Sequence, residues 1–264
     1  MLKYSLILAL GLGAAGLAPA AGVDLDYKDG STKLQGYLVK AAGKDKVPGV
    51  VIVHQWMGLT DYEKGRAEQL SKELGVTVLA ADIYGKGVRA TDMKSAGELS
   101  GKYKANRPLY RQRVKAAVDA LAKQDGVDAS KLAVIGYCFG GTGALEAARA
   151  NLPVKGVVCF HGALDSPGPD KDGIQAKILI LHGAMDKFSS PEQIAAMKQE
   201  FDDAKADWQM TLYSGAVHAF TQPMAGNDPS TGIAYNASAD KRSWQAMKDF
   251  LGELFPSASA GQAL

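Results

Sequence analysis

The chain has 264 residues, of which 47% are hydrophobic and 22% charged, and its formal net charge is +2. This composition is ordinary for a globular protein and excludes disordered, collagenous and coiled-coil classes. Because 30 Lys and Arg nearly balance 28 Asp and Glu, nothing favours nucleic acid or an anionic membrane as a partner. Two cysteines are too few for a disulfide scaffold or a zinc finger, although they could form one disulfide with each other.

The first twenty residues have the pattern of an export signal. Residues 1–3 carry one positive charge, residues 4–17 form an apolar run, and small residues follow at 18–22. We predict a signal peptide over residues 1–20, cleaved after residue 20 or 21, and hence a periplasmic or secreted protein. The alternative is a membrane anchor, but this Gly- and Ala-rich run falls short of the ~20 strongly apolar residues that span a bilayer. No membrane partner is therefore expected after cleavage.

The rest of the chain alternates short apolar runs with longer amphipathic stretches. The predicted strands are 23–27, 33–39, 50–54, 76–82, 131–138, 154–161, 176–182 and 208–214, and the predicted helices are 61–74, 90–104, 109–123, 141–150, 191–204 and 237–255. Strands that are apolar almost throughout are typical of a parallel sheet covered on both faces. The first two strands flank the turn signal Asp29-Gly30-Ser31, which favours an antiparallel hairpin at one edge. We predict a single doubly wound α/β domain over residues 21–264, flexible from about residue 256.

One motif predicts a catalytic nucleophile. A predicted strand runs into Gly136-x-Cys138-x-Gly140 and then into a helix of small residues. This is the pattern of a nucleophile elbow, a sharp strand-to-helix turn that projects its central residue and needs glycines where side chains would collide. The turn would place Cys138 at the positive end of a helix, which favours thiolate over thiol. It would also aim the backbone N–H of Phe139 at an oxyanion.

A thiol nucleophile needs a histidine as base and an acidic residue that orients the histidine. In such a fold the chain order is nucleophile, then acid, then histidine. His218 follows the last predicted strand and is the candidate base. His161 and His182 end strands, where a histidine more often packs or bonds locally, and are weaker candidates. Asp186 follows the later strand and is the preferred acid, while Asp165 after the preceding strand is the alternative; either could instead cap a helix. No spacing of His, Asp and Cys suggests a metal, and no cofactor is predicted.

Several motifs, in the right order, resemble the dienelactone hydrolase family, which are α/β-hydrolases with a Cys-His-Asp triad. They are Gly-Tyr-Cys-Phe-Gly-Gly at 136–141, His-Gly-Ala-Met-Asp at 182–186, Val-His-Ala-Phe at 217–220 and the segment 232–244, with comparable segments at 51–58 and 82–87. The resemblance extends over about residues 23–255. It implies that Cys138 is the nucleophile, His218 the base and Asp186 its orienter, with the N–H of Trp56 as a second oxyanion donor beside that of Phe139.

Three positions depart from the family pattern. Gln55 stands where well-studied members have a glutamate that helps to activate the cysteine, and an amide cannot take a proton. Lys86 and Gln222 stand where the resemblance places two arginines that hold a substrate carboxylate, and neither reproduces a bidentate guanidinium. We expect these three residues to contact the substrate, together with Tyr84. The departures speak against dienelactone itself as substrate and leave hydrolysis as the expected reaction.

The sequence therefore predicts an enzyme that cleaves a small carboxylic ester or lactone through a Cys138 thioester. The alternative is a non-hydrolytic protein of the same fold that binds a ligand or senses oxidation, which Gln55 and Gln222 would favour. Cys159 lies within an apolar strand and is expected to pack as a small hydrophobe, so both thiols should be reduced. The sequence leaves the physiological substrate and the oligomeric state open.

Overall fold

An eight-stranded sheet forms the centre of the molecule, with strand order β1-β2-β4-β3-β5-β6-β7-β8. The computed structural model describes residues 21–43, 45–169 and 173–256, so the predicted signal peptide and nearly all of the predicted tail lie outside the described residues. Strands β1 and β2 form the predicted antiparallel hairpin, β2 also pairs antiparallel with β4, and the other pairs are parallel. The strands are β1 (Val23–Asp29), β2 (Thr32–Val39), β3 (Val47–Val53), β4 (Thr77–Ala81), β5 (Val127–Tyr137), β6 (Gly156–Phe160), β7 (Lys177–Gly183) and β8 (Trp208–Tyr213).

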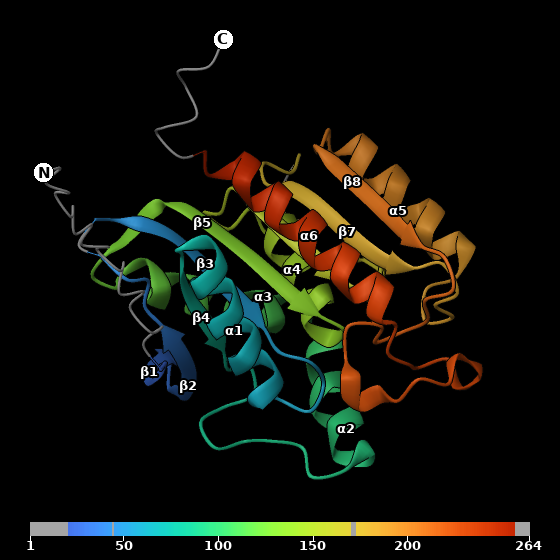
Figure 1. Cartoon of the computed structure of the whole chain (residues 1–264), viewed down its shortest axis with the longest axis horizontal. Coiled ribbons are helices and arrows are strands. Elements are labelled where there is room, and N and C mark those ends of the chain that lie inside the picture. Colours follow the sequence, from blue (N-terminus) through green and yellow to red (C-terminus); the bar gives the residue numbers. More distant parts are fainter. Residues whose placement is uncertain (1–20, 44, 170–172, 257–264) are drawn as a thin grey trace, which may run out of the picture.

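Helices cover both faces of the sheet, which confirms the predicted doubly wound α/β architecture. Figure 1 shows α1 and α6 in front of the sheet, with α3 and α4 behind it. Two apolar clusters explain this arrangement: Val50 and Ile52 of β3 belong to the cluster that α1 and α6 cover, whereas Val51 and Val53 belong to the other cluster. Alternate residues of a strand point to opposite faces, so a strand covered twice must be apolar throughout. The helices are α1 (Asp61–Leu74), α2 (Met93–Lys104), α3 (Arg107–Ala122), α4 (Phe139–Arg149), α5 (Pro191–Asp203) and α6 (Ala237–Leu254), and short 3₁₀ turns lie at η1 (Pro223–Ala225) and η2 (Pro229–Thr231).

Several predicted boundaries differ from those observed, and capping accounts for the differences at α2 and α3. The side chain of Asp92 caps α2, which begins three residues later than predicted, and Asn106 caps α3, which begins two residues earlier. Helix α4 begins at Phe139 rather than at residue 141, because the chain turns at Cys138. The predicted strand 131–138 begins instead at Val127 and ends one residue before the cysteine.

The helix that follows this turn is held by a buried ionic cluster. Glu146 of α4 is fully buried and pairs with Arg111 (2.6 Å), Arg149 (3.0 Å) and Arg107 (3.3 Å). Arg149 also pairs with Glu200 of α5 at 2.8 Å. A buried carboxylate is tolerated only when its charge is paired and its lone pairs are hydrogen-bonded. Here three guanidinium groups meet both needs. The cluster therefore fixes α4 against both α3 and α5.

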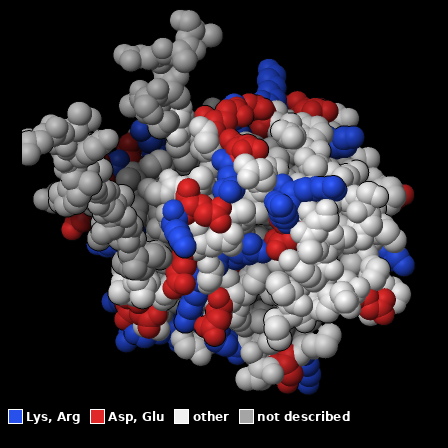
Figure 2. Space-filling model, viewed as in Figure 1, with Lys and Arg blue, Asp and Glu red and all other residues white. Residues whose placement is uncertain are grey.

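On the face that α1 and α6 cover, positive and negative side chains are mixed. In Figure 2, lysines and arginines lie interspersed with aspartates and glutamates on this face. Two cross-pairs, Arg66 with Asp240 (2.6 Å) and Glu73 with Lys248 (2.8 Å), join α1 to α6. Within the described ranges, no helix is both long enough and apolar enough to cross a membrane.

Candidate active site

The turn between β5 and α4 has the geometry of an elbow. Cys138 has φ 54° and ψ −117°, a conformation that non-glycine residues rarely adopt. A Cβ atom on Gly136 would collide with the backbone oxygen of Gly140, and a Cβ atom on Gly140 would collide with that of Val53. The N–H of Cys138 is held by the carbonyl of Phe160 at 3.0 Å. The two glycines thus allow the close backbone contacts that project the cysteine from the end of the sheet.

The structure brings the three predicted catalytic candidates together. The Nε2 atom of His218 lies 3.1 Å from the Sγ atom of Cys138, and its Nδ1 atom lies 2.9 Å from Oδ2 of Asp186. The other carboxylate oxygen of Asp186 accepts the N–H of Phe188 at 2.9 Å, and the Asp186 side chain is fully buried. Each of the three residues follows a parallel strand, namely β5, β7 or β8. Because the carboxyl ends of these strands share one edge, a linear order in sequence becomes a cluster in space.

Cys138 and His218 stabilise each other's charged forms. Burial alone would raise the pKa of the Cys138 thiol, but the charge and hydrogen bond of His218, with Lys104 and the N–H of Phe139, bring this pKa below its ordinary value. Burial alone would lower the pKa of His218, but the Cys138 thiolate and the Asp186 carboxylate raise it to about 10. Both shifts favour the thiolate–imidazolium pair over the neutral thiol and imidazole.

The pH dependence of thiol alkylation checks this pairing. In the wild type, the rate of Cys138 alkylation by iodoacetamide should rise with pH about a midpoint below the ~8.5 of an ordinary thiol, since only the thiolate reacts. In His218→Asn the cation is lost while the burial that raises the thiol pKa remains, so the midpoint should move to higher pH. Intact mass counts the labels, and the fully buried Cys159 should not react. Equal midpoints in the two proteins would contradict the pairing.

The weaker sequence candidates are not part of the hydrogen-bond chain from Cys138 through His218 to Asp186. The Nδ1 atom of His161 accepts the N–H of Cys138 at 3.1 Å, and its Nε2 atom lies 2.9 Å from Thr221 Oγ1, so this ring supports the elbow backbone. His182 is buried, with Nε2 3.8 Å from Oδ2 of Asp186, and neither ring nitrogen has a hydrogen-bond partner among the described residues. Asp165 pairs with Arg107 at 2.6 Å rather than with a histidine.

A cavity of about 520 Å³ opens over Cys138. Two predicted substrate contacts, Gln55 and Gln222, line it, as do the two residues predicted to supply oxyanion donors, Trp56 and Phe139. The side-chain nitrogen of Gln55 is buried and has no hydrogen-bond partner among the described residues, so it is available to a ligand. The remaining walls come from Gly97, Ser100, Gly101, Lys104, Ala163, Phe188, His218, Ala219, Met224, Ala225 and Ile233.

Two predicted substrate contacts do not line this cavity. The prediction for Lys86 is wrong in placement: its backbone N–H is held by the carbonyl of Lys33 in β2, and its exposed ammonium pairs with Asp26 of β1 at 2.6 Å. Tyr84 is buried, and its hydroxyl donates to the carbonyl of Trp56 at 2.8 Å, so it supports the cavity wall from behind. The cation that does reach the cavity is Lys104, at the end of α2.

Sequence reasoning missed Lys104 and the apolar walls supplied by Phe188, Met224 and Ile233. The side chains of Phe188 and Met224 are exposed, at 55% and 93%. Ile233 lies in the matched segment 232–244, but that segment assigns it no role. No motif marks the other three residues, which lie at the end of α2, in the loop after β7 and in the turn η1. Exposed apolar side chains around a cavity are a signal of ligand binding, but they are recognised only once the fold is known.

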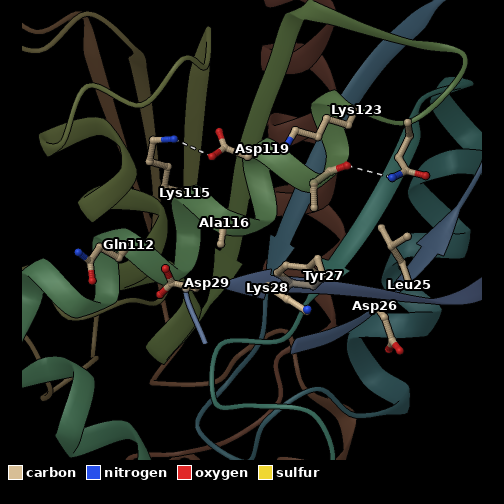
Figure 3. A pocket seen from close by; sticks show the side chains of 13 residues that line it. Leu25, Asp26, Tyr27, Lys28, Asp29, Gln112, Lys115, Ala116, Asp119 and Lys123 are labelled. Atoms are coloured by element: carbon tan, nitrogen blue, oxygen red, sulfur yellow. Dashed lines mark hydrogen bonds and ion pairs between the residues drawn. The ribbon is translucent and has the colours of Figure 1, made fainter. Parts of the chain in front are cut away.

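A second cavity, of about 560 Å³, lies between β1 and α3. Figure 3 shows its side chains, among which Lys115 and Asp119 of α3 pair with each other at 2.6 Å. Its lining contains no cysteine or histidine. Across the described part of the chain, no three His, Cys, Asp or Glu side chains gather so that they could hold a metal ion. The reactive groups therefore gather in the cavity over Cys138.

Comparison with known proteins identifies the family. A sequence model described as the dienelactone hydrolase family matches residues 34–255. The crystal structure of a dienelactone hydrolase-like promiscuous phosphotriesterase, P91, from metagenomic libraries is 39% identical, with a TM-score of 0.84 over 90% of this chain and all of that one. A structure named m3DLH is 37% identical, with a TM-score of 0.85 over 89% of this chain and 98% of that one. A Yersinia pestis protein, whose name provisionally assigns it carboxymethylenebutenolidase activity, is 28% identical over 77% of each chain. The chain belongs to the dienelactone hydrolase family and has its α/β-hydrolase fold.

Proposed function

We propose that the protein hydrolyses carboxylic esters or lactones, with Cys138 as the nucleophile. The observation that carries the proposal is the continuous chain from the Cys138 sulfur through His218 to the buried Asp186, with links of 3.1 and 2.9 Å. Family membership supports hydrolysis of an ester or lactone, and this chain of hydrogen bonds supports the cysteine as the attacking group.

In the first half-reaction, the Cys138 thiolate attacks the carbonyl carbon and forms a C–S bond. The N–H groups of Phe139 and Trp56 donate hydrogen bonds that stabilise the negative charge developing on the carbonyl oxygen. When the tetrahedral intermediate collapses, the C–O bond to the leaving group breaks. The His218 imidazolium then gives its Nε2 proton to the departing alkoxide, which leaves a thioester and a neutral imidazole.

In the second half-reaction, neutral His218 takes a proton from a water molecule that attacks the thioester carbonyl. Collapse of the second intermediate breaks the C–S bond and restores the thiolate–imidazolium pair with release of the carboxylic acid. Asp186 holds the proton on Nδ1 and stabilises the imidazolium throughout. The side-chain amide of Gln55 cannot take up a proton, so the activation of Cys138 rests on His218 and the helix end.

The cavity favours substrates that are neutral and largely apolar. Trp56, Phe188, Met224 and Ile233 form apolar walls. Apart from the imidazolium of His218, Lys104 is the one cation among the lining residues. A paired guanidinium clamp for a carboxylate is lacking in this lining, so a carboxylate-bearing substrate would rely on a single ammonium. Because the similar protein P91 is named a promiscuous phosphotriesterase, a neutral phosphotriester belongs in the substrate panel.

Trapping the acyl-enzyme tests the proposal. The wild type is mixed with 4-nitrophenyl butyrate, quenched in acid while turnover continues, and analysed by mass spectrometry. We expect one butyryl group on the peptide that contains Cys138, released by neutral hydroxylamine as a thioester is. Repeating the experiment with 4-nitrophenyl hemisuccinate, whose acyl group carries a carboxylate, measures what Lys104 contributes.

The Cys159→Ala variant is the matched control, because Cys159 is fully buried and its pKa is raised to about 12 by burial. This variant should acylate at Cys138 as the wild type does. Turnover with the butyryl group on another residue would refute the cysteine mechanism. Absence of both turnover and acylation across the panel would favour the non-hydrolytic alternative.

A further inference from the structure

His54 is a buried histidine outside the catalytic cluster, and both of its ring nitrogens bind the backbone. It follows β3, is fully buried and does not line the cavity. Its Nε2 atom accepts the N–H of Ile83 at 3.2 Å, and its Nδ1 atom lies 2.6 Å from the carbonyl oxygen of Gln55. An amide N–H can only donate, so Nε2 is unprotonated and Nδ1 carries the proton that it donates to Gln55. Burial lowers the pKa of His54 to about 4, which keeps this neutral form at neutral pH.

The carbonyl that His54 holds belongs to the same peptide unit as the N–H of Trp56. A trans peptide is planar, so its C=O and N–H point in opposite directions and turn together. The carbonyl also accepts the N–H of Gly58 at 3.1 Å. Among the described residues no acceptor for the N–H of Trp56 is present. Two hydrogen bonds on one side of the peptide thus set the direction of a free donor on the other.

The neighbouring peptides are fixed as well, so this unit has little freedom to rotate. The N–H of Gln55 donates to Glu63 Oε1 at 3.2 Å, and the carbonyl of Trp56 accepts the Tyr84 hydroxyl at 2.8 Å. The segment also presses against the elbow: a Cβ atom on Gly140 would lie 2.7 Å from the carbonyl oxygen of His54. The N–H of Trp56 therefore stands beside the start of the helix that supplies the N–H of Phe139.

We infer that His54 is a positioning residue, whose hydrogen bond to the Gln55 carbonyl aims the N–H of Trp56 at the oxyanion of the acylation intermediate. The inference rests on the proposed function, because it needs an oxyanion to form over Cys138. It assigns His54 no contact with the substrate and no proton transfer. Its expected effect is therefore on kcat, since a donor aimed at the oxyanion acts in the transition state rather than on the bound ester.

Three substitutions separate the two hydrogen bonds of the ring. His54→Asn can keep a donor near the place of Nδ1, His54→Gln can keep an acceptor near the place of Nε2, and His54→Leu keeps neither. For 4-nitrophenyl butyrate we expect kcat to fall about a hundredfold or more in the Leu and Gln variants, with KM changed by less than about threefold. The Asn variant should recover at least about a tenth of the wild-type kcat. The polar Gln and Asn variants keep the test decisive if the Leu variant does not fold.

The rate of Cys138 alkylation by iodoacetamide distinguishes positioning from general damage. Alkylation displaces iodide and forms no oxyanion, so its rate and pH midpoint should match the wild type in all three variants. A wild-type kcat in the Leu and Gln variants would overturn the inference, and so would alkylation that falls in parallel with kcat. The proposed function fails separately: in that case the wild type forms no acyl-enzyme on Cys138, whatever stands at position 54.

Discussion

The Cys138→Ala variant is expected to lose at least about ten-thousandfold of the wild-type kcat for 4-nitrophenyl butyrate. Without the sulfur no acyl-enzyme forms, and only the oxyanion donors and the base His218 remain to assist direct attack by water. The fold should persist, because the thiol makes one side-chain hydrogen bond, to His218, and alanine keeps the Cβ atom at the elbow. Ester hydrolysis, together with a thermal melt of each variant, measures both expectations.

Two controls make this loss specific. Cys159→Ala removes a thiol of the same kind, one that packs in β6, and should keep kcat within about threefold of the wild type. Cys138→Ser should remain at least about a hundredfold below the wild type, since a hydroxyl does not ionise to form an ion pair with His218. A Cys138→Ala protein that keeps more than about one per cent of the activity would show that another group attacks the carbonyl.

Much of this architecture is predictable because each local pattern has one strong physical cause. Continuous apolar runs such as 50–53 predict strands buried on both faces, and the turn at residues 29–31 predicts the hairpin. The proximity of Cys138, Asp186 and His218 also follows from the sequence, since each lies at the end of a predicted strand or in the loop that follows it. Neither conclusion requires knowledge of how the loops fold.

What the sequence does not predict depends on loop paths and on helix placement. Lys86 lies between Gly85 and Gly87, which have φ values of 139° and 79°, and this turn carries its side chain to the hairpin. The position of Lys86 along the chain does not predict the direction of that turn. Lys104 reaches the cavity because α2 is held by a long-range contact, in which Tyr103 stacks on Tyr84 with ring centroids 5.5 Å apart, and no local pattern specifies this contact. Long-range placement of this kind emerges only from the packed tertiary structure.

The histidines show the same dependence on loops. His161 follows β6 and His182 lies within β7, but the contacts of their rings, with the N–H of Cys138 and with the Asp186 carboxylate at 3.8 Å, depend on how the loops beyond the strands fold. For His54, the sequence indicates only a residue at the end of a strand. Its link to the Trp56 peptide depends on a ring orientation that is set by Ile83 of the neighbouring segment.

Gly140→Ala is expected to lower the free energy of unfolding by about 2 to 4 kcal/mol. The added methyl group would meet the backbone oxygens of Val53, the last residue of β3, and of His54, and these backbone atoms cannot move aside as a flexible side chain could. To relieve the overlap, the elbow and the end of β3 must separate. A displacement of about 1 Å between the nucleophile and an oxyanion donor is enough to cost about a hundredfold in rate. We therefore expect kcat of the folded variant to fall by at least that factor.

Gly65→Ala supplies the matched control, because it adds the same methyl group where nothing lies within 4 Å. Gly65 is an exposed residue within α1, where alanine should stabilise the helix by about 0.5 to 1 kcal/mol and leave kcat unchanged. Urea denaturation and ester hydrolysis of both variants measure these opposite effects. If Gly140→Ala is as stable and as active as the wild type, the close approach of β3 to the elbow does not position the nucleophile. If only its activity falls, the contact serves the oxyanion donors more than it serves the fold.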